Sequence, residues 1–396
     1  MNKKGMTTVF VTIVAGSVIS LVICFVTLAC REAAVSYSES VMNLAGRSVL
    51  AEFDRDLKKR YGLIAFYGQK DEIEEKILDY SSYALDKRQY VRIGDIEADL
   101  KDFSLGDRSV FENEIREYTE YYLPFLALDR KERGPVTTGK RVLRNSEILS
   151  QMPSNAFEDI SDSTDIIGTI KNLSSISDLF RAGTMKYYSN LYIFSKFYSG
   201  QSTDYKDDSF FRNEVEYIIA GENSDDENLS EIRKKIIGIR TALNLIYLQN
   251  DSGKQAAALA AAQLITPGPE AEITKTFLIA SWAAAEAQND WKLLIEGRNV
   301  PVYKDDGSWA TDISYVTDQA ADRAYPESEA GFCYDEYLMI LLYSIKDEVK
   351  YARMMDLIEI NMKGTCRAGM KLKDMYRGFS FSVQINGRKH EYMEKY

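Results

Sequence analysis

An N-terminal apolar run constrains this chain more than any other feature. The 24 residues from Met6 to Ala29 carry no charged side chain and no proline. As a helix rising about 1.5 Å per residue, the run is about 36 Å long, enough to cross a hydrocarbon core of about 30 Å. The sequence therefore predicts a transmembrane anchor, with the lipid bilayer as the first partner.

Two alternatives compete with an uncleaved anchor. A cleaved secretory signal has an apolar core of about 7–15 residues, and this run is longer. A lipoprotein signal would acylate Cys30, but Arg31 follows it directly. Lys3 and Lys4 precede the run, and positive charge favours the cytoplasmic side. We therefore expect a single-pass protein of the cell membrane, with a cytoplasmic N-terminus and the bulk of the chain extracellular.

The helical pattern continues beyond the membrane. No proline occurs between Met6 and Arg60, and apolar side chains recur at every fourth position after residue 36. Residues at this spacing are neighbours on a helix surface. We expect one helix from 6 to 60, half in lipid and half as the spine of a domain, with a kink near 31–32 as the alternative. The recurring residues are Tyr37, Val41, Ala45, Val49, Phe53, Leu57 and Tyr61.

Composition bounds the rest of the chain. The hydrophobic fraction of 45% is normal for a packed protein. A net charge of −11 argues against a nucleic-acid partner, which would need a basic face. Of the four cysteines, Cys24 and Cys30 lie in or beside the apolar run. Cys333 and Cys366 can form a disulfide outside the cytosol, and two buried free thiols are the alternative.

The remaining sequence predicts a mainly α, α+β fold with a small antiparallel sheet. Residues 91–105 alternate like a half-buried strand at Ile96, Ala98 and Leu100. Asn386-Gly387 is a strong hairpin signal, and we expect the hairpin to pair with the strand at 91–105. Its inward face would be Phe379, Phe381, Val383 and Ile385. Helices are expected at 71–89, 108–127, 162–200, 224–248, 252–289 with a break at 267–269, 331–345 and 347–362.

Composition also suggests four segments. These are a leader and anchor (1–30), a membrane-proximal helix-strand-helix region (31–128), a basic loop or linker (129–145) and a helical domain that ends in the hairpin (146–396). The basic segment contains six Lys or Arg residues. Such a segment is typical of an exposed loop or connector.

Catalytic and cofactor motifs are not recognisable. Residues 134–140 match the start of a phosphate-binding loop, but Arg141 stands where Ser or Thr must hold magnesium, so we expect no nucleotide. His390 is the single histidine and lies in the expected hairpin, facing solvent. The acids 225–227 follow Ser224 as a helix capping box. We expect no catalytic residue, cofactor or metal, and a carboxylate-pair hydrolase is the least favoured class.

Several blocks resemble an uncharacterised family of TadE/TadG-like membrane proteins, whose genes accompany Tad (Flp-type) pilus loci in Gram-positive bacteria. They begin with KKGMTTVFVTIVAGSVISLVICFVTLACREAA and include EYIIAGENSDDENLSEIRKKIIGIRTALNLIYL and YDEYLMILLYSIKDEVKYARMMDLIEINM. The resemblance implies an N-terminal pilin-like helix and an accessory place in pilus assembly. Gly5-Met6 occupies the position of a prepilin cleavage junction, but Phe10 replaces the usual glutamate. A retained anchor is therefore favoured.

Two classes of function remain. The first is a pseudopilin-like structural component of a Tad-like pilus or surface-display apparatus, which contacts other pilus-assembly membrane proteins. Gly16 and Ser20, four residues apart, would allow another helix to approach in the bilayer. The alternative is an extracytoplasmic ligand-binding or sensory domain. A filled core with exposed apolar patches favours the first class, and a deep pocket with convergent polar groups favours the second.

Overall fold

The chain divides into two compact units in this computed structural model. Residues 1–110 and 371–396 form one, here called the anchor unit, and residues 111–370 form the helical unit. These units follow contacts, whereas the four segments expected from the sequence follow composition. The structure describes residues 3–85, 90–126, 134–143, 152–156, 185–317, 331–366 and 368–396.

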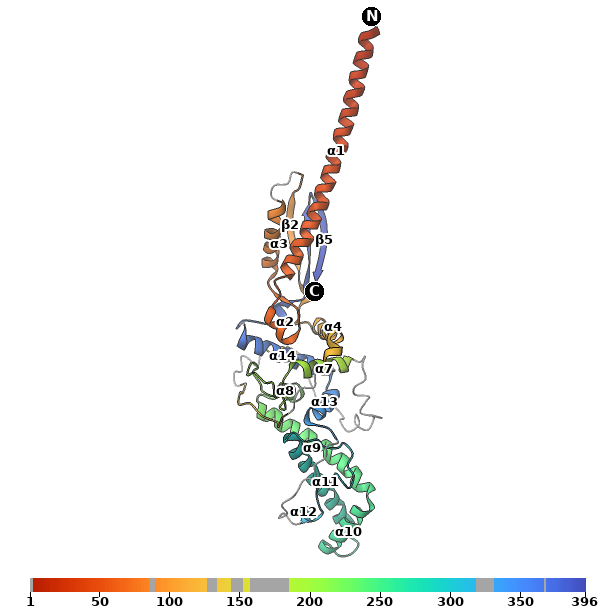
Figure 1. Ribbon diagram of the computed structural model, residues 1–396, viewed down its shortest axis with the longest axis vertical. Helices are drawn as coiled ribbons and strands as arrows, with labels where there is room; N and C mark the ends of the chain where they lie inside the picture. The colour runs from red at the N-terminus through yellow and green to blue at the C-terminus, as the bar shows by residue number, and fades with distance from the viewer. Residues whose placement is uncertain are drawn as a thin grey trace. The chain divides into compact units, whose positions relative to one another are not determined.

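Helix α1 (Lys3–Leu50) opens the anchor unit and runs without a break through the expected kink site at 31–32 (Figure 1). The expected continuation to residue 60 is wrong, because α2 (Arg55–Tyr61) starts as a separate helix. Asp54 causes the restart: its carboxylate accepts the backbone N–H of Leu57 at 2.8 Å and so caps the new helix.

Three strands form the antiparallel sheet of the anchor unit, in the order β2-β4-β5. They are β2 (Ile93–Asp99), β4 (Gly378–Ile385) and β5 (Arg388–Lys395). The expected pairing of the hairpin with the 91–105 strand is confirmed, since Ala98 lies opposite Phe381. Asn386 and Gly387 make the turn with φ values of 52° and 82°. The short β1 (Phe66–Tyr67) pairs with β3 (Met375–Tyr376).

The core of the anchor unit lies between this sheet and two helices. The second half of α1 and helix α3 (Lys70–Leu85) pack on the sheet, and Figure 1 shows both helices beside β2 and β5. All four apolar residues of β4 that were expected to face inward are buried. The core is completed by Val41, Met42, Ala45, Val49 and Leu50 of α1 and by Ile73, Ile77 and Leu85 of α3.

The helical unit follows the expected helix pattern closely within the described residues. Its helices are α4 (Arg108–Leu126, starting just before the unit boundary), α7 (Met185–Lys196), α8 (Glu214–Ala220), α9 (Asp225–Asn250), α10 (Ser252–Ile265), α11 (Ala271–Ile295), α12 (Ser314–Thr317), α13 (Tyr334–Ser344) and α14 (Asp347–Thr365). Short 3-10 turns are η2 (Pro153–Ala156) in this unit, and η1 (Lys101–Phe103) and η4 (Leu372–Asp374) in the anchor unit.

Local sequence signals explain where several of these helices begin and end. The Ser224 hydroxyl accepts the N–H of Glu227 at 3.2 Å, so the expected cap of α9 is confirmed. The break between α10 and α11 falls at the expected Pro267-Gly268-Pro269. Tyr192 and Phe197 are buried, so aromatic residues of this stretch contribute to the core. Residues 162–184 of the helix expected at 162–200 lie outside the described part.

The described part of the basic segment, residues 134–143, is an extended loop held by backbone hydrogen bonds. Val136 donates its N–H to Ile295 at 2.8 Å, and Leu143 donates to Asn223 at 2.8 Å. Gly139 lies so close to the Asp225 carboxylate that a β-carbon would collide with it. A loop was expected here, but its middle part is pinned along the helical unit and does not act as a free connector.

Candidate functional site

Helix α1 has two chemically different halves. Its most apolar 18 residues have a mean hydropathy of 2.8, and none of them is buried. The helix is thus long and apolar enough to cross a membrane, although a signal sequence near an N-terminus has the same features. Its large exposed side chains include Phe10, Ile13, Ile19, Leu21, Ile23, Phe25 and Leu28.

The second half of α1 is built for close contact with the hairpin. Gly46 faces β5 and β4, where a β-carbon would lie only 2.9 Å from Cγ of Glu394 and 3.0 Å from Cε1 of Phe381. Real β-carbons essentially never come closer than about 3 Å to another heavy atom. Glycine is therefore required here for the helix to approach the sheet.

Two polar contacts border this interface. His390 on β5 lies 2.9 Å from a carboxylate oxygen of Glu39 on α1. Arg47 lies 3.7 Å from Glu394. The His390 side chain is only 20% exposed, so the expectation of a solvent-facing histidine is wrong. The register places it opposite Val383, and α1 covers this side of the strand. Its role here is to dock the hairpin on α1.

The remaining residues singled out from the sequence are placed as follows. Gly5 and Met6 lie in the first turns of α1. Gly16 and Ser20 lie one turn apart in the exposed half, and a β-carbon on Gly16 would meet nothing within 4 Å. Cys333 is buried and Cys366 is exposed. The structure does not join them, and the disulfide stays a prediction.

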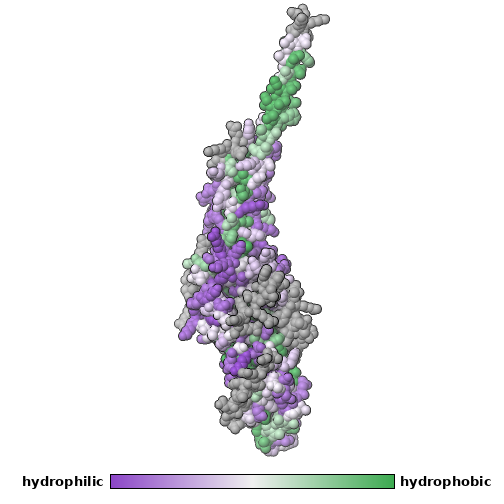
Figure 2. Space-filling view, in the orientation of Figure 1, coloured by the Kyte–Doolittle hydropathy of each residue, from purple (hydrophilic) through white to green (hydrophobic). Residues whose placement is uncertain are grey.

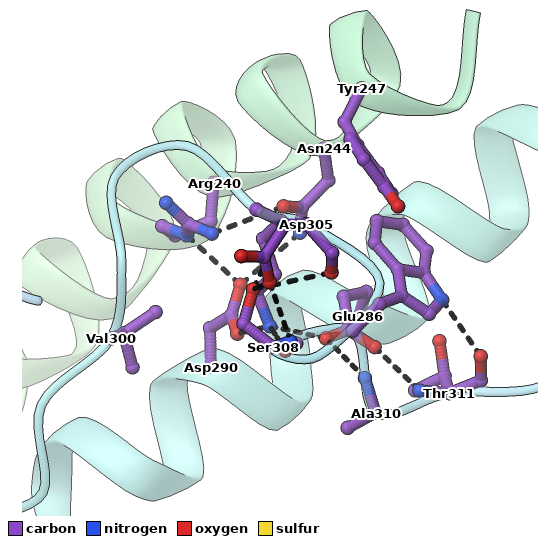
Figure 3. A network of polar contacts seen from close by, with 12 residues as sticks. Arg240, Asn244, Tyr247, Glu286, Asp290, Val300, Asp305, Ser308, Ala310 and Thr311 are labelled. Carbon is purple, nitrogen blue, oxygen red and sulfur yellow. Dashed lines mark hydrogen bonds and ion pairs between the residues drawn. The ribbon is translucent and has the colours of Figure 1, made fainter. Parts of the chain in front are cut away.

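The most concentrated polar chemistry of the helical unit is a buried charge network between α9 and α11 (Figure 3). Arg240 and Asn244 project from one face of α9, and Glu286 and Asp290 from one face of α11. Each pair is four residues apart, so its members are neighbours on their helix. Lys304 enters from the loop that follows α11. Arg240, Glu286 and Asp290 are 0% exposed.

Arg240 is held on three sides. Its Nε donates to Asp290 Oδ2 at 2.9 Å, Nη1 donates to the carbonyl of Val302 at 2.8 Å, and Nη2 donates to Asn244 Oδ1 at 3.1 Å. Burial alone lowers the pKa of Arg240, but Tyr337 and Asp290 raise it above its ordinary value. The guanidinium therefore stays charged and ties the loop at Val302 to α9.

Lys304 completes the charge balance. Its Nζ forms an ion pair with Glu286 and lies 2.6 Å from Asp290 Oδ1. It also donates to the carbonyl of Ser308 at 3.0 Å. Two cations and two carboxylates thus offset one another in a site without water access. Buried charges persist only when they are paired and hydrogen-bonded in this way.

Glu286 also fixes the loop backbone. Its two carboxylate oxygens accept the N–H groups of Ala310 at 3.1 Å and Thr311 at 2.8 Å. Thr311 in turn accepts from the indoles of Trp282 at 3.0 Å and Trp309 at 2.7 Å. These contacts and those of Arg240 hold the loop that follows α11 against helices α9 and α11. The charged groups of the network are directed at one another.

A second group of buried acids surrounds helix α8. Glu216 accepts the N–H of Gly200 at 2.8 Å and the hydroxyl of Tyr334 at 2.9 Å. Asp356 accepts from Ser154 and Tyr217, each at 2.9 Å. Burial raises the pKa of Glu216 to about 7 and that of Asp356 to about 6. Burial is the main cause of both shifts, and the hydrogen bonds from these neutral donors offset it only in part.

A hollow of about 650 Å³ opens on the outer face of the anchor-unit sheet. Glu97 and Glu391 flank Ser382 there, because these residues are opposite one another on the three strands. The lining also includes Lys70, Asp99, Lys101, Ser380 and Lys389. It is a shallow, polar surface. Among the described residues, no group of three or more His, Cys, Asp or Glu side chains could hold a metal ion.

Sequence reasoning missed the buried charge network. One available signal was the pair Glu286 and Asp290, two acids one turn apart in the helix that carries Trp282 and Trp291. The hydrophobic pattern of that helix places both acids on the side that holds the tryptophans. Their partners Arg240 and Lys304 come from elements about 50 residues away and 18 residues away in sequence.

Together the fold and these contacts define a mostly helical protein with a long apolar N-terminal helix and a buried charge network. A family model described as a family of unknown function, DUF5702, matches residues 129–387. The chain belongs to this family. No curated protein and no solved structure matches the chain significantly.

Proposed function

We propose that this protein is a single-pass, pseudopilin-like accessory component of a Tad-like pilus assembly or surface-display apparatus, with a structural rather than a catalytic role. The observation that carries the proposal is the division of α1. Its first half is apolar and wholly exposed, and its second half is buried against an antiparallel sheet. A helix of this kind supports the proposal because the resemblance of the N-terminal sequence implies a pilin-like helix.

The two halves of α1 are stable in different environments. An exposed apolar stretch of this length is costly in water and stable in lipid. The buried half, by contrast, needs the folded anchor unit to cover Val41, Met42 and Ala45. The helix thus connects a bilayer to a folded domain. Lys3 and Lys4 favour an N-terminus in the cytoplasm and a domain outside the cell.

The helical unit supports a structural role. The charges of the buried network around Arg240 are compensated by one another, and four large hydrophobic side chains are exposed near the turn between α10 and α11. Filled cores with exposed apolar surface are typical of proteins that act by association. The alternative, a ligand-binding or sensory domain, would have to use the hollow over Glu97 and Glu391, which is open and polar rather than enclosed.

Fractionation of cells that express the full chain tests the proposal. We expect the chain to stay in the membrane pellet after carbonate extraction, at its full mass or shortened only by residues 1–5. Protease added outside wall-stripped cells should remove a C-terminal tag. A soluble chain shortened near Cys30 would show a cleaved signal and overturn the anchor. A tag digested only after lysis would overturn the orientation.

Partner capture tests the place in the pilus apparatus. Photo-cross-linking from position 16 of α1 should trap other membrane proteins of the apparatus, because small residues at 16 and 20 let a helix approach. The control is the same probe at Val22, on a different side of the helix. Equal capture at both positions would remove Gly16 and Ser20 as a specific contact.

A further inference from the structure

Lys304 and Asp290 hold an amine nitrogen and a carboxyl carbon close together in the buried charge network. Nζ of Lys304 lies 2.6 Å from Oδ1 of Asp290, and the two side chains are 2% and 0% exposed. A C–O bond is about 1.2 Å long, so Nζ lies within about 3.8 Å of Cγ of Asp290. Bound groups react from separations of about 3–3.5 Å, so little movement is needed for a bond to form.

The two carboxylate oxygens of Asp290 have different surroundings. Oδ2 accepts hydrogen bonds from Nε of Arg240 at 2.9 Å and from Nδ2 of Asn244 at 3.2 Å (Figure 3). Oδ1 has no hydrogen-bond partner within the described residues, although Nζ of Lys304 lies beside it. This contact has the distance of an ion pair without the direction of a hydrogen bond. Oδ1 can therefore leave without breaking a hydrogen bond, whereas Oδ2 is held in place.

Glu286 places a base at the same nitrogen. Its Oε1 atom forms an ion pair with Nζ of Lys304, and the Glu286 side chain is 0% exposed. Its two oxygens also accept the backbone N–H groups of Ala310 and Thr311, which fix the carboxylate in position. A carboxylate fixed beside a reacting group can carry protons to and from it.

We propose that Lys304 and Asp290 condense to an intramolecular amide bond, with Glu286 as the proton carrier. Glu286 takes one proton from the Lys304 ammonium and passes it to Oδ1 of Asp290. The amine nitrogen then adds to Cγ, and Arg240 and Asn244 stabilise the negative charge that develops on Oδ2. A second proton passes from the nitrogen through Glu286 to Oδ1, the Cγ–Oδ1 bond breaks, and water leaves. One ammonium and one carboxylate thus become one amide and one water molecule, without an oxidant or a cofactor.

Burial favours the amide over the ion pair. Two charged groups are costly in a buried site, whereas a neutral amide with hydrogen-bond partners costs less. The new carbonyl oxygen is Oδ2, which keeps Arg240 and Asn244 as donors. The charge of the site also stays balanced, because Arg240 and Glu286 remain as one cation and one carboxylate. The bond would fix the loop that follows α11 to that helix covalently.

An exposed ion pair of the same length provides the contrast. Nζ of Lys254 lies 2.6 Å from Oδ1 of Asp306, but the Asp306 side chain is 85% exposed. Oδ1 of Asp306 accepts hydrogen bonds from Lys254 and from the hydroxyl of Tyr247. Water hydrates the charged groups of such a surface pair, so we expect no condensation there. The pair is therefore an internal control.

Peptide mass mapping of the purified full chain tests the bond. By sequence, trypsin releases residues 276–292, which contain Asp290, and cleaves after Lys304 to release residues 299–304. The amide blocks cleavage after Lys304 and joins residues 276–292 to residues 299–323. In most of the folded chain we expect this linked pair of peptides, lighter than the sum of its parts by one water molecule. Complete cleavage after Lys304 would overturn the proposal.

Two variants test the chemistry. Asp290→Asn keeps the carbon that is attacked and releases ammonia in place of water, so we expect a linked pair of the same mass as in the parent chain. Glu286→Gln removes the proton carrier, and we expect at least about tenfold less of the linked pair. Circular dichroism shows whether each variant is folded. If Glu286→Gln does not fold, the parent chain and Asp290→Asn decide the result.

Three outcomes would contradict the assignment of the residues. Fragmentation of the linked pair locates the carboxyl group, and a bond to Glu286 would overturn Asp290 as the reacting group. Absence of the pair from a folded Asp290→Asn chain would have the same consequence. A link between Lys254 and Asp306 in the same digest would show that condensation does not require burial.

The amide is independent of the membrane anchor. The exposed apolar half of α1 lies in the anchor unit, where Figure 2 shows its hydrophobic surface, and Asp290 and Lys304 lie in the helical unit. A linked chain that carbonate extracts from membranes would retain the amide and reject the anchor. A carbonate-resistant chain that trypsin cleaves completely after Lys304 would retain the anchor and reject the amide.

Discussion

Arg240 of α9 and Asp290 of α11 form an ion pair in which neither side chain is exposed, with 2.9 Å between Nε and Oδ2. The pair joins two helices whose sequences are separated by the whole of α10. The pair stabilises the fold because each buried charge is compensated by the other. Each charge would be costly in the core without the other, and the loop at Val302 uses the same guanidinium.

Replacing Asp290 with Ala should strongly destabilise the protein. The change leaves Arg240 without its carboxylate and Lys304 with only Glu286. Breaking a buried pair on one side costs about 3–5 kcal/mol. Thermal unfolding of the detergent-solubilised chain measures this. The matched control is Glu231→Ala, which breaks the exposed pair with Lys234 and should cost less than about 1 kcal/mol. Similar losses of stability in both variants would show that the buried ion pair is no more costly to break than the exposed one.

Replacing Glu216 with Gln should change how stability depends on pH. The pKa of Glu216 is raised to about 7 in the folded chain from an ordinary 4.5. Between these values the folded state binds more protons than the unfolded state, so this group lowers stability as pH rises from about 4.5 to about 7. Glutamine does not titrate, so it removes this decrease in the free energy of unfolding, which amounts to about 3 kcal/mol at pH 8.

Unfolding curves at pH 5 and pH 8 check this prediction. Glu216→Gln should gain stability over the parent mainly at pH 8. Asp356 has a pKa raised to about 6, so Asp356→Asn should act in the same direction over a lower window. A constant difference between Glu216→Gln and the parent at both pH values would show that the carboxyl does not titrate in this range.

Replacing Gly46 with Val should separate the hairpin from α1. A β-carbon there meets Glu394 and Phe381, so the helix or the strands must move, at a cost of about 1–3 kcal/mol. Gly16→Val is the matched control, since nothing lies within 4 Å of a β-carbon at that position. It should leave the melting temperature unchanged. Equal melting temperatures for both variants would contradict the close packing of α1 on the sheet.

Replacing Phe381 with Ala should cost about 3–5 kcal/mol, as for a buried aromatic side chain. Phe381 is 2% exposed, and its ring stacks on that of Tyr392 at 4.8 Å. Met393→Ala, on the opposite face of β5 and 66% exposed, should change stability by less than about 0.5 kcal/mol. Denaturant unfolding compares the two. A small loss for Phe381→Ala would make the hairpin an appendage rather than part of the core.

Predictions of helices and strands from the sequence were accurate wherever the signal lay within a few neighbouring residues. The hairpin follows from Asn386-Gly387 between alternating residues, because the turn needs positive φ at both positions. The start of α9 follows from Ser224, and the break after α10 from Pro267 and Pro269. The end of α1 was missed because Asp54 reads equally well inside an exposed helical turn. Only its contact with the N–H of Leu57 shows that it starts α2.

Local patterns in the amino-acid sequence alone determined the long apolar N-terminal helix, most helices of the described part, and the terminal hairpin with its inward face. These features depend on neighbours within a few residues, so hydrophobic period and turn chemistry suffice. Tertiary structure alone decided that Arg240, Asp290, Glu286 and Lys304 meet, that His390 is covered by α1, and that Glu216 is buried enough to raise its pKa. Each of these results depends on which surfaces pack together when the residues are far apart in the sequence. The resulting burial then determines the free-energy cost of each charge.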